Sequence, residues 1–215
     1  KLKTGVLNPV IERATVRRLR ETFGDQIQQL RVDPNQVWST ATAINELKKL
    51  AEYDLEYCED PTFNLEGMSR VRATVPVPLA TNMAVLNFDQ VAPMLRMRAL
   101  DVILVDPYFW GGITQGKKLA AVAETFGFGL AIHSDRELGI GMTASLHLWA
   151  TTPSLCHKYD SHYPFQVDDI ITEPLRWKDG AVALPKGPGL GVEIDPDKLK
   201  KYHRLYLKKG DEIEF

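Results

Sequence analysis

The chain has 215 residues, a net charge of −2 and a pI near 6.2, and 44% of its residues are hydrophobic. This apolar fraction is enough to build a core, yet no apolar run approaches the ~20 residues that a bilayer-spanning helix needs, so no membrane partner is expected. Because Lys and Arg are scattered along a slightly acidic chain, we also expect no nucleic-acid partner.

Helical patterns and short apolar runs alternate along the first 160 residues. Helical spacing of apolar residues predicts helices over residues 9–23, 41–53, 64–74, 113–126 and 138–150, and another from Phe88 past Met97. Strands are predicted at the intervening runs IQQLRVD, LEYCE, PLAT, VILVD, GLAIH and SLCHKYD. Such alternation with short loops implies a parallel sheet with right-handed crossovers, and we predict a β/α barrel.

The pattern changes after Asp160. The segment LRWKDGAVALP predicts a β-hairpin on an Asp179-Gly180 turn, and a closing helix is expected from Asp195. We therefore expect residues 1–160 to form the barrel units and residues 161–215 to form a C-terminal segment of the same structural unit. Cys58 and Cys156 lie in apolar runs and are predicted to be reduced core thiols, which fits a cytoplasmic protein.

Five polar residues end predicted strands at roughly even intervals: Asp33, Glu59, Asn82, Asp106 and His133. Each alone has a simple structural alternative as a turn former, a cap or a hydrogen-bonded histidine. Together they would all point into one mouth of a barrel. Active sites of this fold are built at that mouth, so the joint pattern predicts an active site.

The chemistry of these five residues is specific. Asp33, Glu59 and Asn82 offer three oxygen ligands of the kind that Mg²⁺ prefers. A bound dication can hold a substrate carboxylate and stabilise the enediolate formed when the adjacent C–H proton is removed. Asp106 would hold the imidazole of His133 in one tautomer and raise its basicity, which makes a general base.

Lys1 and Lys3 straddle one strand position, so both point toward the same region. A lysine near another cation has a lowered pKa and can act as a base. The alternative, two solvated charges at a strand end, remains open from the sequence. The start at Lys1-Leu2-Lys3 is no initiator sequence and no signal peptide, and we expect an upstream part to precede it.

These motifs resemble those of the enolase superfamily, and within it the glucarate dehydratases and their close relatives. The resemblance extends from Lys1 to about Leu207. It is carried by Lys-x-Lys (Lys1, Lys3), DPN (Asp33, Asn35), EDP (Glu59), ATNM (Asn82), VILVD (Asp106), IHS (His133) and DSHYP (His162).

The resemblance implies a TIM-like (β/α)7β barrel that normally follows an N-terminal capping domain, with the capping domain and first barrel strand lacking here. It implies that the three oxygen ligands bind Mg²⁺. His133, paired with Asp106, would be the base on one face of the substrate, and Lys3, tuned by Lys1, the base on the other.

The resemblance further implies a set of substrate contacts: Asn35, Ser134, Asp135 and His162. Asp135 stands where the family usually has Asn. The expected activity is that of a Mg²⁺-dependent acid-sugar dehydratase, which makes a 2-keto-3-deoxy acid from a glucarate-like aldarate. A racemase or epimerase of the same superfamily and a catalytically silent paralogue are the alternatives. A cytoplasmic homo-oligomer with a small-molecule acid-sugar substrate is expected.

Overall fold

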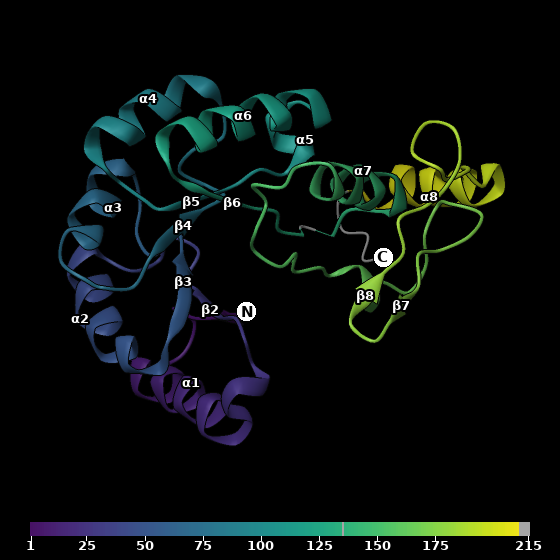
Figure 1. Cartoon of the computed structure of the whole chain (residues 1–215). Coiled ribbons are helices and arrows are strands. Elements are labelled where there is room, and N and C mark those ends of the chain that lie inside the picture. The colour runs from purple at the N-terminus through teal and green to yellow at the C-terminus, as the bar shows by residue number, and fades with distance from the viewer. Residues whose placement is uncertain (135, 211–215) are drawn as a thin grey trace.

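The computed structural model describes residues 1–134 and 136–210, and a parallel sheet is the centre of this part of the chain (Figure 1). Its six strands pair in chain order, from β1 to β6. The strands are β1 Leu2–Lys3, β2 Leu30–Asp33, β3 Leu55–Glu59, β4 Leu79–Thr81, β5 Val102–Leu104 and β6 Gly129–Ala131. Every pair is parallel, which is the β/α winding of a TIM-type barrel, so the predicted fold class is confirmed.

Helices cover the outer side of the curved sheet (Figure 1). Asparagine or serine side chains accept a backbone N–H at the starts of the first four, which satisfies donors that a helix start leaves unpaired. The helices of this part are α1 Pro9–Phe23, α2 Thr40–Leu50, α3 Leu65–Arg72, α4 Phe88–Met97, α5 Pro107–Trp110, α6 Ile113–Phe126 and α7 Gly139–Ala150, and the 3-10 turns are η1 Gly24–Gln26 and η2 Ala51–Tyr53.

Both faces of the sheet are buried. A large apolar cluster fills the space between the strands and the surrounding helices, and a smaller one fills the inside of the curve. The inner cluster consists of Tyr57, Ala80, Val102, Leu104 and Ala131. Because alternate residues of a strand share a face, a residue two positions after an inner one also points inward, beyond the apolar cluster. This alternation directs the polar strand ends toward the mouth.

Replacing Leu47 with Ala is expected to lower the free energy of unfolding by about 2–5 kcal/mol. Leu47 of α2 is 0% exposed and belongs to the outer cluster, so the change leaves a cavity. Urea unfolding followed by circular dichroism measures the loss. The matched variant Leu207→Ala, at a residue that is 70% exposed, should stay within about 0.5 kcal/mol of the parent. Equal effects of the two variants would contradict this packing.

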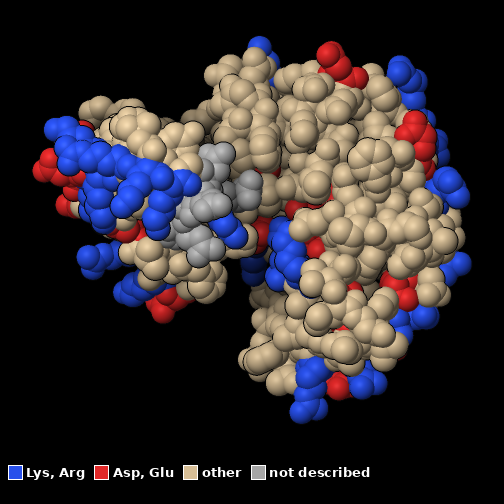
Figure 2. All heavy atoms as spheres, turned by 180° about the vertical axis from the view of Figure 1, so that it is seen from behind, with Lys and Arg blue, Asp and Glu red and all other residues tan. Residues whose placement is uncertain are grey.

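The C-terminal part contains the predicted hairpin and helix. Strands β7 (Trp177–Lys178) and β8 (Ala181–Val182) pair antiparallel, and Asp179 and Gly180 both have positive φ, as a type I′ turn requires. The 3-10 turn η3 Tyr163–Phe165 precedes this hairpin, and α8 Pro196–Lys209 follows it. Lys and Arg side chains gather on the lobe that carries α8 (Figure 2).

The strand predicted at residues 154–160 is wrong, because none forms there. The segment is held instead by side chains of β2 and of the residue before it: Arg31 Nη2 donates to the Lys158 carbonyl (2.8 Å), and the Lys158 N–H donates to Gln29 Oε1 (3.2 Å). Cys156 in this segment is exposed, which corrects its prediction as a core thiol, whereas Cys58 is buried. No helix of the described residues is long and apolar enough to cross a membrane.

Candidate active site

A cavity of about 710 Å³ lies at the carboxyl ends of the strands. It brings together seven of the eleven residues that the sequence singled out: Lys1, Lys3, Asn35, Asn82, His133, Ser134 and His162. Met83, Leu86, Phe109 and Arg136 complete its wall. Three further predicted residues, Asp33, Glu59 and Asp106, are 0% exposed. Each contacts a side chain of the cavity wall: Lys3, Lys1 and His133, respectively. The remaining one, Asp135, lies outside the described residues.

Two lysines and three carboxylates form an ion cluster at one end of this cavity. The Nζ of Lys1 is 2.9 Å from Glu59 Oε2, 3.0 Å from Asp160 Oδ2 and 3.7 Å from Asp33 Oδ2. The Nζ of Lys3 is 2.5 Å from the same Asp33 oxygen. The parallel register of β1 on β2, which pairs Lys3 with Asp33, produces this approach. Three carboxylates therefore share two ammonium groups.

The ion cluster controls protonation. Burial lowers the pKa of the Lys1 ammonium, but the carboxylates of Glu59, Asp160 and Asp33 outweigh burial, so the pKa lies above its usual value. Lys1 therefore does not have the lowered pKa that can accompany a neighbouring cation, because three carboxylates surround it. The base role expected of Lys3 stays a prediction. Burial raises the pKa of Glu59 to about 7, against the opposing effect of Lys1. The side chain of Lys1 is 8% exposed, which also excludes a solvated charge there.

His133 and Asp106 form the predicted dyad. The imidazole Nδ1 lies 2.6 Å from Asp106 Oδ2, and the His133 backbone N–H donates to Asp106 Oδ1 (2.9 Å). The other ring nitrogen, Nε2, lies 2.8 Å from Asn82 Nδ2, a group that only donates, so Nε2 accepts and the proton sits on Nδ1. Burial lowers the pKa of His133, but the bonded Asp106 carboxylate outweighs it and the pKa is raised.

Two of the predicted metal ligands carry buried oxygens without a partner. Glu59 Oε1 and Asn82 Oδ1 accept no hydrogen bond from the described residues, although buried polar atoms are nearly always paired. Those residues contain no group of three His, Cys, Asp or Glu side chains placed as a metal site, and the predicted set has only two carboxylates. The two unpaired oxygens, with Asp33 between the lysines, fit a hard cation that takes oxygen ligands.

The sequence reasoning missed Asp60, which follows Glu59 and is 0% exposed. Its carboxylate accepts from the Thr81 hydroxyl (2.6 Å), from the Asn82 N–H (2.8 Å) and from Gln36 Nε2 (3.2 Å). Asp60 therefore ties the loops after β2 and β4 to the end of β3. The signal was a second carboxylate directly after a strand end, in EDP.

Replacing Asp60 with Asn is expected to lower the free energy of unfolding by about 1–3 kcal/mol, because an amide nitrogen cannot accept these bonds. It should also weaken Mg²⁺ binding about 10- to 100-fold, since Asn82 loses its support. Thermal unfolding and titration calorimetry with MgCl₂ measure the two effects.

Asp169→Asn is the matched control for Asp60→Asn. Asp169 is 2% exposed and accepts a hydrogen bond from the Gly139 N–H (3.0 Å) at the start of α7, away from the proposed metal ligands. The control should lose stability without losing Mg²⁺ affinity. Equal Mg²⁺ losses in the two variants would contradict the role given to Asp60.

The predicted substrate contacts are placed unevenly. Asn35 Oδ1 accepts from Lys3 (3.0 Å) at the cavity wall. The hydroxyl of Ser134 is already engaged, because it donates to Glu137 Oε2 (2.9 Å) and accepts from the His162 N–H (2.9 Å). Ser134 and His162 therefore hold the loop after β6 against the segment after residue 160.

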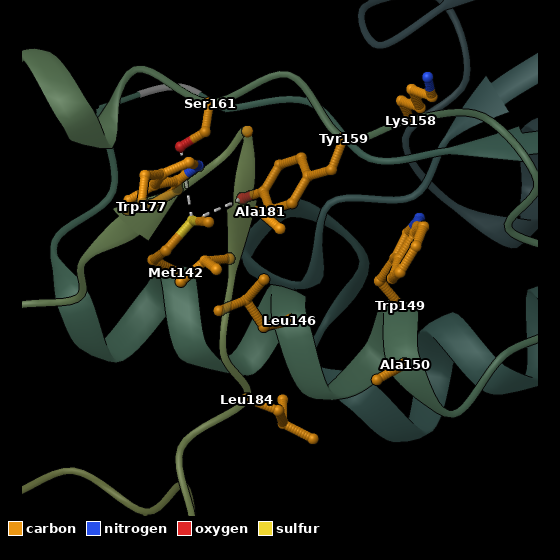
Figure 3. A pocket seen from close by; sticks show the side chains of 12 residues that line it. Met142, Leu146, Trp149, Ala150, Lys158, Tyr159, Ser161, Trp177, Ala181 and Leu184 are labelled. Atoms are coloured by element: carbon orange, nitrogen blue, oxygen red, sulfur yellow. Dashed lines mark hydrogen bonds between the residues drawn. The ribbon is translucent and has the colours of Figure 1, made fainter.

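A second cavity, of about 400 Å³, lies between α7 and the β7–β8 hairpin (Figure 3). Its wall includes Met142, Leu146 and Trp177, and the Tyr159 hydroxyl lies 3.2 Å from the sulfur of Met142. No group of acid, base and cation side chains lines this cavity within the described chain. The barrel mouth, which contains the His133–Asp106 dyad and seven of the predicted residues, is the candidate active site.

Comparison with known proteins agrees with this fold. The family model described as Enolase C-terminal domain-like matches residues 1–198, and the chain belongs to that family. A curated relative, the probable glucarate dehydratase of Streptomyces coelicolor, is 43% identical over 207 residues, which cover 96% of this chain and 47% of the relative. Muconate cycloisomerase 1 of Rhodococcus opacus is 30% identical over 95% of the chain and 55% of its own length.

Solved structures of similar proteins superpose closely. An enolase from Mycobacterium smegmatis complexed with tartrate has a TM-score of 0.91 and 42% identity, over 99% of this chain and 51% of that one. An enolase from Pseudomonas fluorescens with bound magnesium, potassium and tartrate has a TM-score of 0.90 and 38% identity, over 97% and 49%. The chain thus spans about half the length of these relatives, and it is the barrel part of an enolase-superfamily protein.

Proposed function

We propose that this barrel carries the catalytic groups of a Mg²⁺-dependent acid-sugar dehydratase. The observation that carries the proposal is the His133–Asp106 dyad, which opens into the same cavity as Lys3 and the ion cluster. The substrate would be a hydroxylated diacid of the glucarate type. The product would be a 2-keto-3-deoxy acid, formed by loss of the α-proton and the β-hydroxyl as water. A cytoplasmic homo-oligomer remains part of this proposal.

His133 would act as the base on one face of the substrate. Its unprotonated Nε2 points away from Asp106, and the buried carboxylate stabilises the imidazolium that forms when Nε2 takes the α-proton. The same nitrogen would then return a proton to the departing hydroxide, so that water leaves. Lys3, which is half exposed in the cavity, would be the group on the opposite face, with Lys1 beside it.

Asp33, Glu59 and Asn82 would hold Mg²⁺ in this proposal. When bound, the ion anchors a substrate carboxylate and stabilises the charge that develops there as the α-proton leaves. The buried oxygens without partners on Glu59 and Asn82 support this ligand set. Asn35, His162 and Asp135 would contact the polyol, and the Ser134 hydroxyl holds the backbone of His162.

The names and ligands of the relatives support a hydroxylated dicarboxylate as the class of substrate. One is a probable glucarate dehydratase, and two solved structures are complexed with tartrate, a hydroxylated dicarboxylate. Epimerisation is the second candidate, favoured by two possible bases in one cavity, His133 and Lys3. The 30% identity to a cycloisomerase is consistent with other chemistries of this superfamily. A catalytically silent paralogue is the alternative of a different class.

Incubation of full-length protein with MgCl₂ and a library of aldaric and aldonic acids in D₂O tests the proposal. Formation of a 2-keto-3-deoxy acid would support dehydration and identify the substrate. Deuterium exchange at the α-carbon without loss of water would favour epimerisation. Bound Mg²⁺ with neither signal would favour the silent paralogue and make Asp135→Asn the first variant to test.

A further inference from the structure

We propose that Arg136 binds the second carboxylate of a diacid substrate and so selects dicarboxylates over monocarboxylates. This inference rests on the proposed function, which places the first carboxylate at the ion cluster. Arg136 directly follows the loop residues after β6 and lines the barrel-mouth cavity with His133 and His162. The sequence analysis assigned no role to Arg136.

The charges of the cavity wall distinguish Arg136 from the lysines. Lys1 and Lys3 each contact carboxylates of the protein, so their charges are already compensated. Arg136 makes no hydrogen bond or ion pair with any residue in 1–134 or 136–210. The cavity therefore has a cationic side chain that is available to an anionic ligand.

The position of Arg136 suits the far end of a ligand. Lys3 and the proposed metal ligands lie at the ends of β1 to β4, whereas Arg136 follows β6, at the other edge of the six-stranded sheet. A ligand anchored by one carboxylate near Glu59 would extend past His133 toward this edge. Met83, Leu86 and Phe109 give the wall apolar surface for the carbon chain of such a ligand.

The backbone of Arg136 is in an unusual conformation. Its φ is +63°, in the left-handed region that residues other than glycine seldom adopt. Such conformations persist where the surrounding structure imposes them, often at ligand-binding loops. The Ser134 hydroxyl donates to the Glu137 carboxylate at 2.9 Å, so the residue that follows Arg136 is tied to the segment that ends β6.

The chemistry of the guanidinium points to a carboxylate. Its planar fork of donors matches the two oxygens of a carboxylate and binds them in a bidentate manner, which a lysine cannot do. An aldarate has a carboxylate at each end of its chain, and an aldonate has only one. Arg136 therefore supplies a subsite that an aldonate leaves empty.

The test is equilibrium binding of D-glucarate and D-gluconate to full-length protein in MgCl₂ by titration calorimetry. These two ligands share a six-carbon chain and one carboxylate, and differ in the second. Arg136→Gln is expected to weaken glucarate binding about 10- to 100-fold and to leave gluconate binding unchanged. Arg136→Lys should give a smaller loss, because the charge stays and the fork is lost.

Arg96→Gln is the matched control. Arg96 is exposed on α4 and does not line the cavity, so this substitution removes the same charge outside the proposed subsite. It should change neither affinity. Equal losses for both acids in Arg136→Gln, or no loss for either, would overturn the assignment of Arg136. In both cases keto-acid formation by the parent protein would leave the proposed function standing. A parent protein that binds Mg²⁺ but neither acid would overturn both.

Discussion

Replacement of His133 with Asn should reduce turnover of the acid sugar about 10²- to 10⁴-fold while Mg²⁺ affinity stays unchanged. The Asn amide has the size to fill the position of the near side of the imidazole, and it can donate to Asp106 as Nδ1 does at 2.6 Å. It has no basic nitrogen at the position of Nε2. The variant thus removes proton transfer and keeps the buried hydrogen bond.

Three measurements separate loss of the base from loss of the fold. Keto-acid formation gives the rate, α-deuterium exchange in D₂O reports proton abstraction alone, and calorimetry with MgCl₂ reports the metal site. Both rates should fall together. His203→Asn, at an exposed position of α8, is the matched control and should behave as the parent. An unchanged exchange rate in His133→Asn would mean that another group takes the proton.

The strand–helix alternation was sufficient to predict the sheet because consecutive β/α units pair in chain order. It failed at residues 154–160, where an apolar run and the expected spacing were both present. A strand also needs a neighbouring backbone, and in the described chain β6 pairs with β5 alone. Side-chain contacts from Arg31 and Gln29 hold that segment instead. A local pattern contains no information about the presence of a partner.

The convergence of the site residues was predictable from the sequence, but several of their side-chain contacts were not. Polar residues at the carboxyl ends of parallel strands converge whatever their side-chain conformations, so the dyad and the cavity followed from spacing. The ion pair between Lys1 and Asp160 could not be predicted from spacing. It joins the first and last residues of the barrel units, and it depends on side-chain conformations alone. The buried hydrogen bonds of Asp60 are of the same kind.

The availability of Arg136 was also hidden in the sequence. In the sequence, Arg136 stands between two acidic residues, Asp135 and Glu137, and side chains at consecutive positions often diverge. The structure turns the backbone of Arg136 into the left-handed region and places Glu137 against Ser134 instead. Charge patterning along a chain therefore says little about which charge a cavity receives.

Replacement of Glu59 with Gln should weaken Mg²⁺ binding by more than the 10- to 100-fold that loss of an outer-shell partner typically costs, since Glu59 is a proposed ligand itself. Titration calorimetry with MgCl₂ measures the loss. Glu124→Gln, on the exposed side of α6, should have no effect. An unchanged Mg²⁺ affinity in Glu59→Gln would contradict the ligand set.

Without Mg²⁺, in EDTA, Glu59→Gln is expected to stabilise the folded protein relative to the parent as the pH rises. Burial raises the pKa of Glu59 to about 7 in the folded chain, above the ~4.5 of an exposed glutamate. The folded state then binds more protons than the unfolded state between these two values, so Glu59 costs stability as the pH rises through this window. Gln carries no charge, and Lys1 keeps Asp160 and Asp33 as partners. The melting temperature of Glu59→Gln relative to the parent should therefore rise from pH 4.5 to pH 7 and then level off. A constant difference across that range would show that the Glu59 carboxylate is fully compensated without a metal ion.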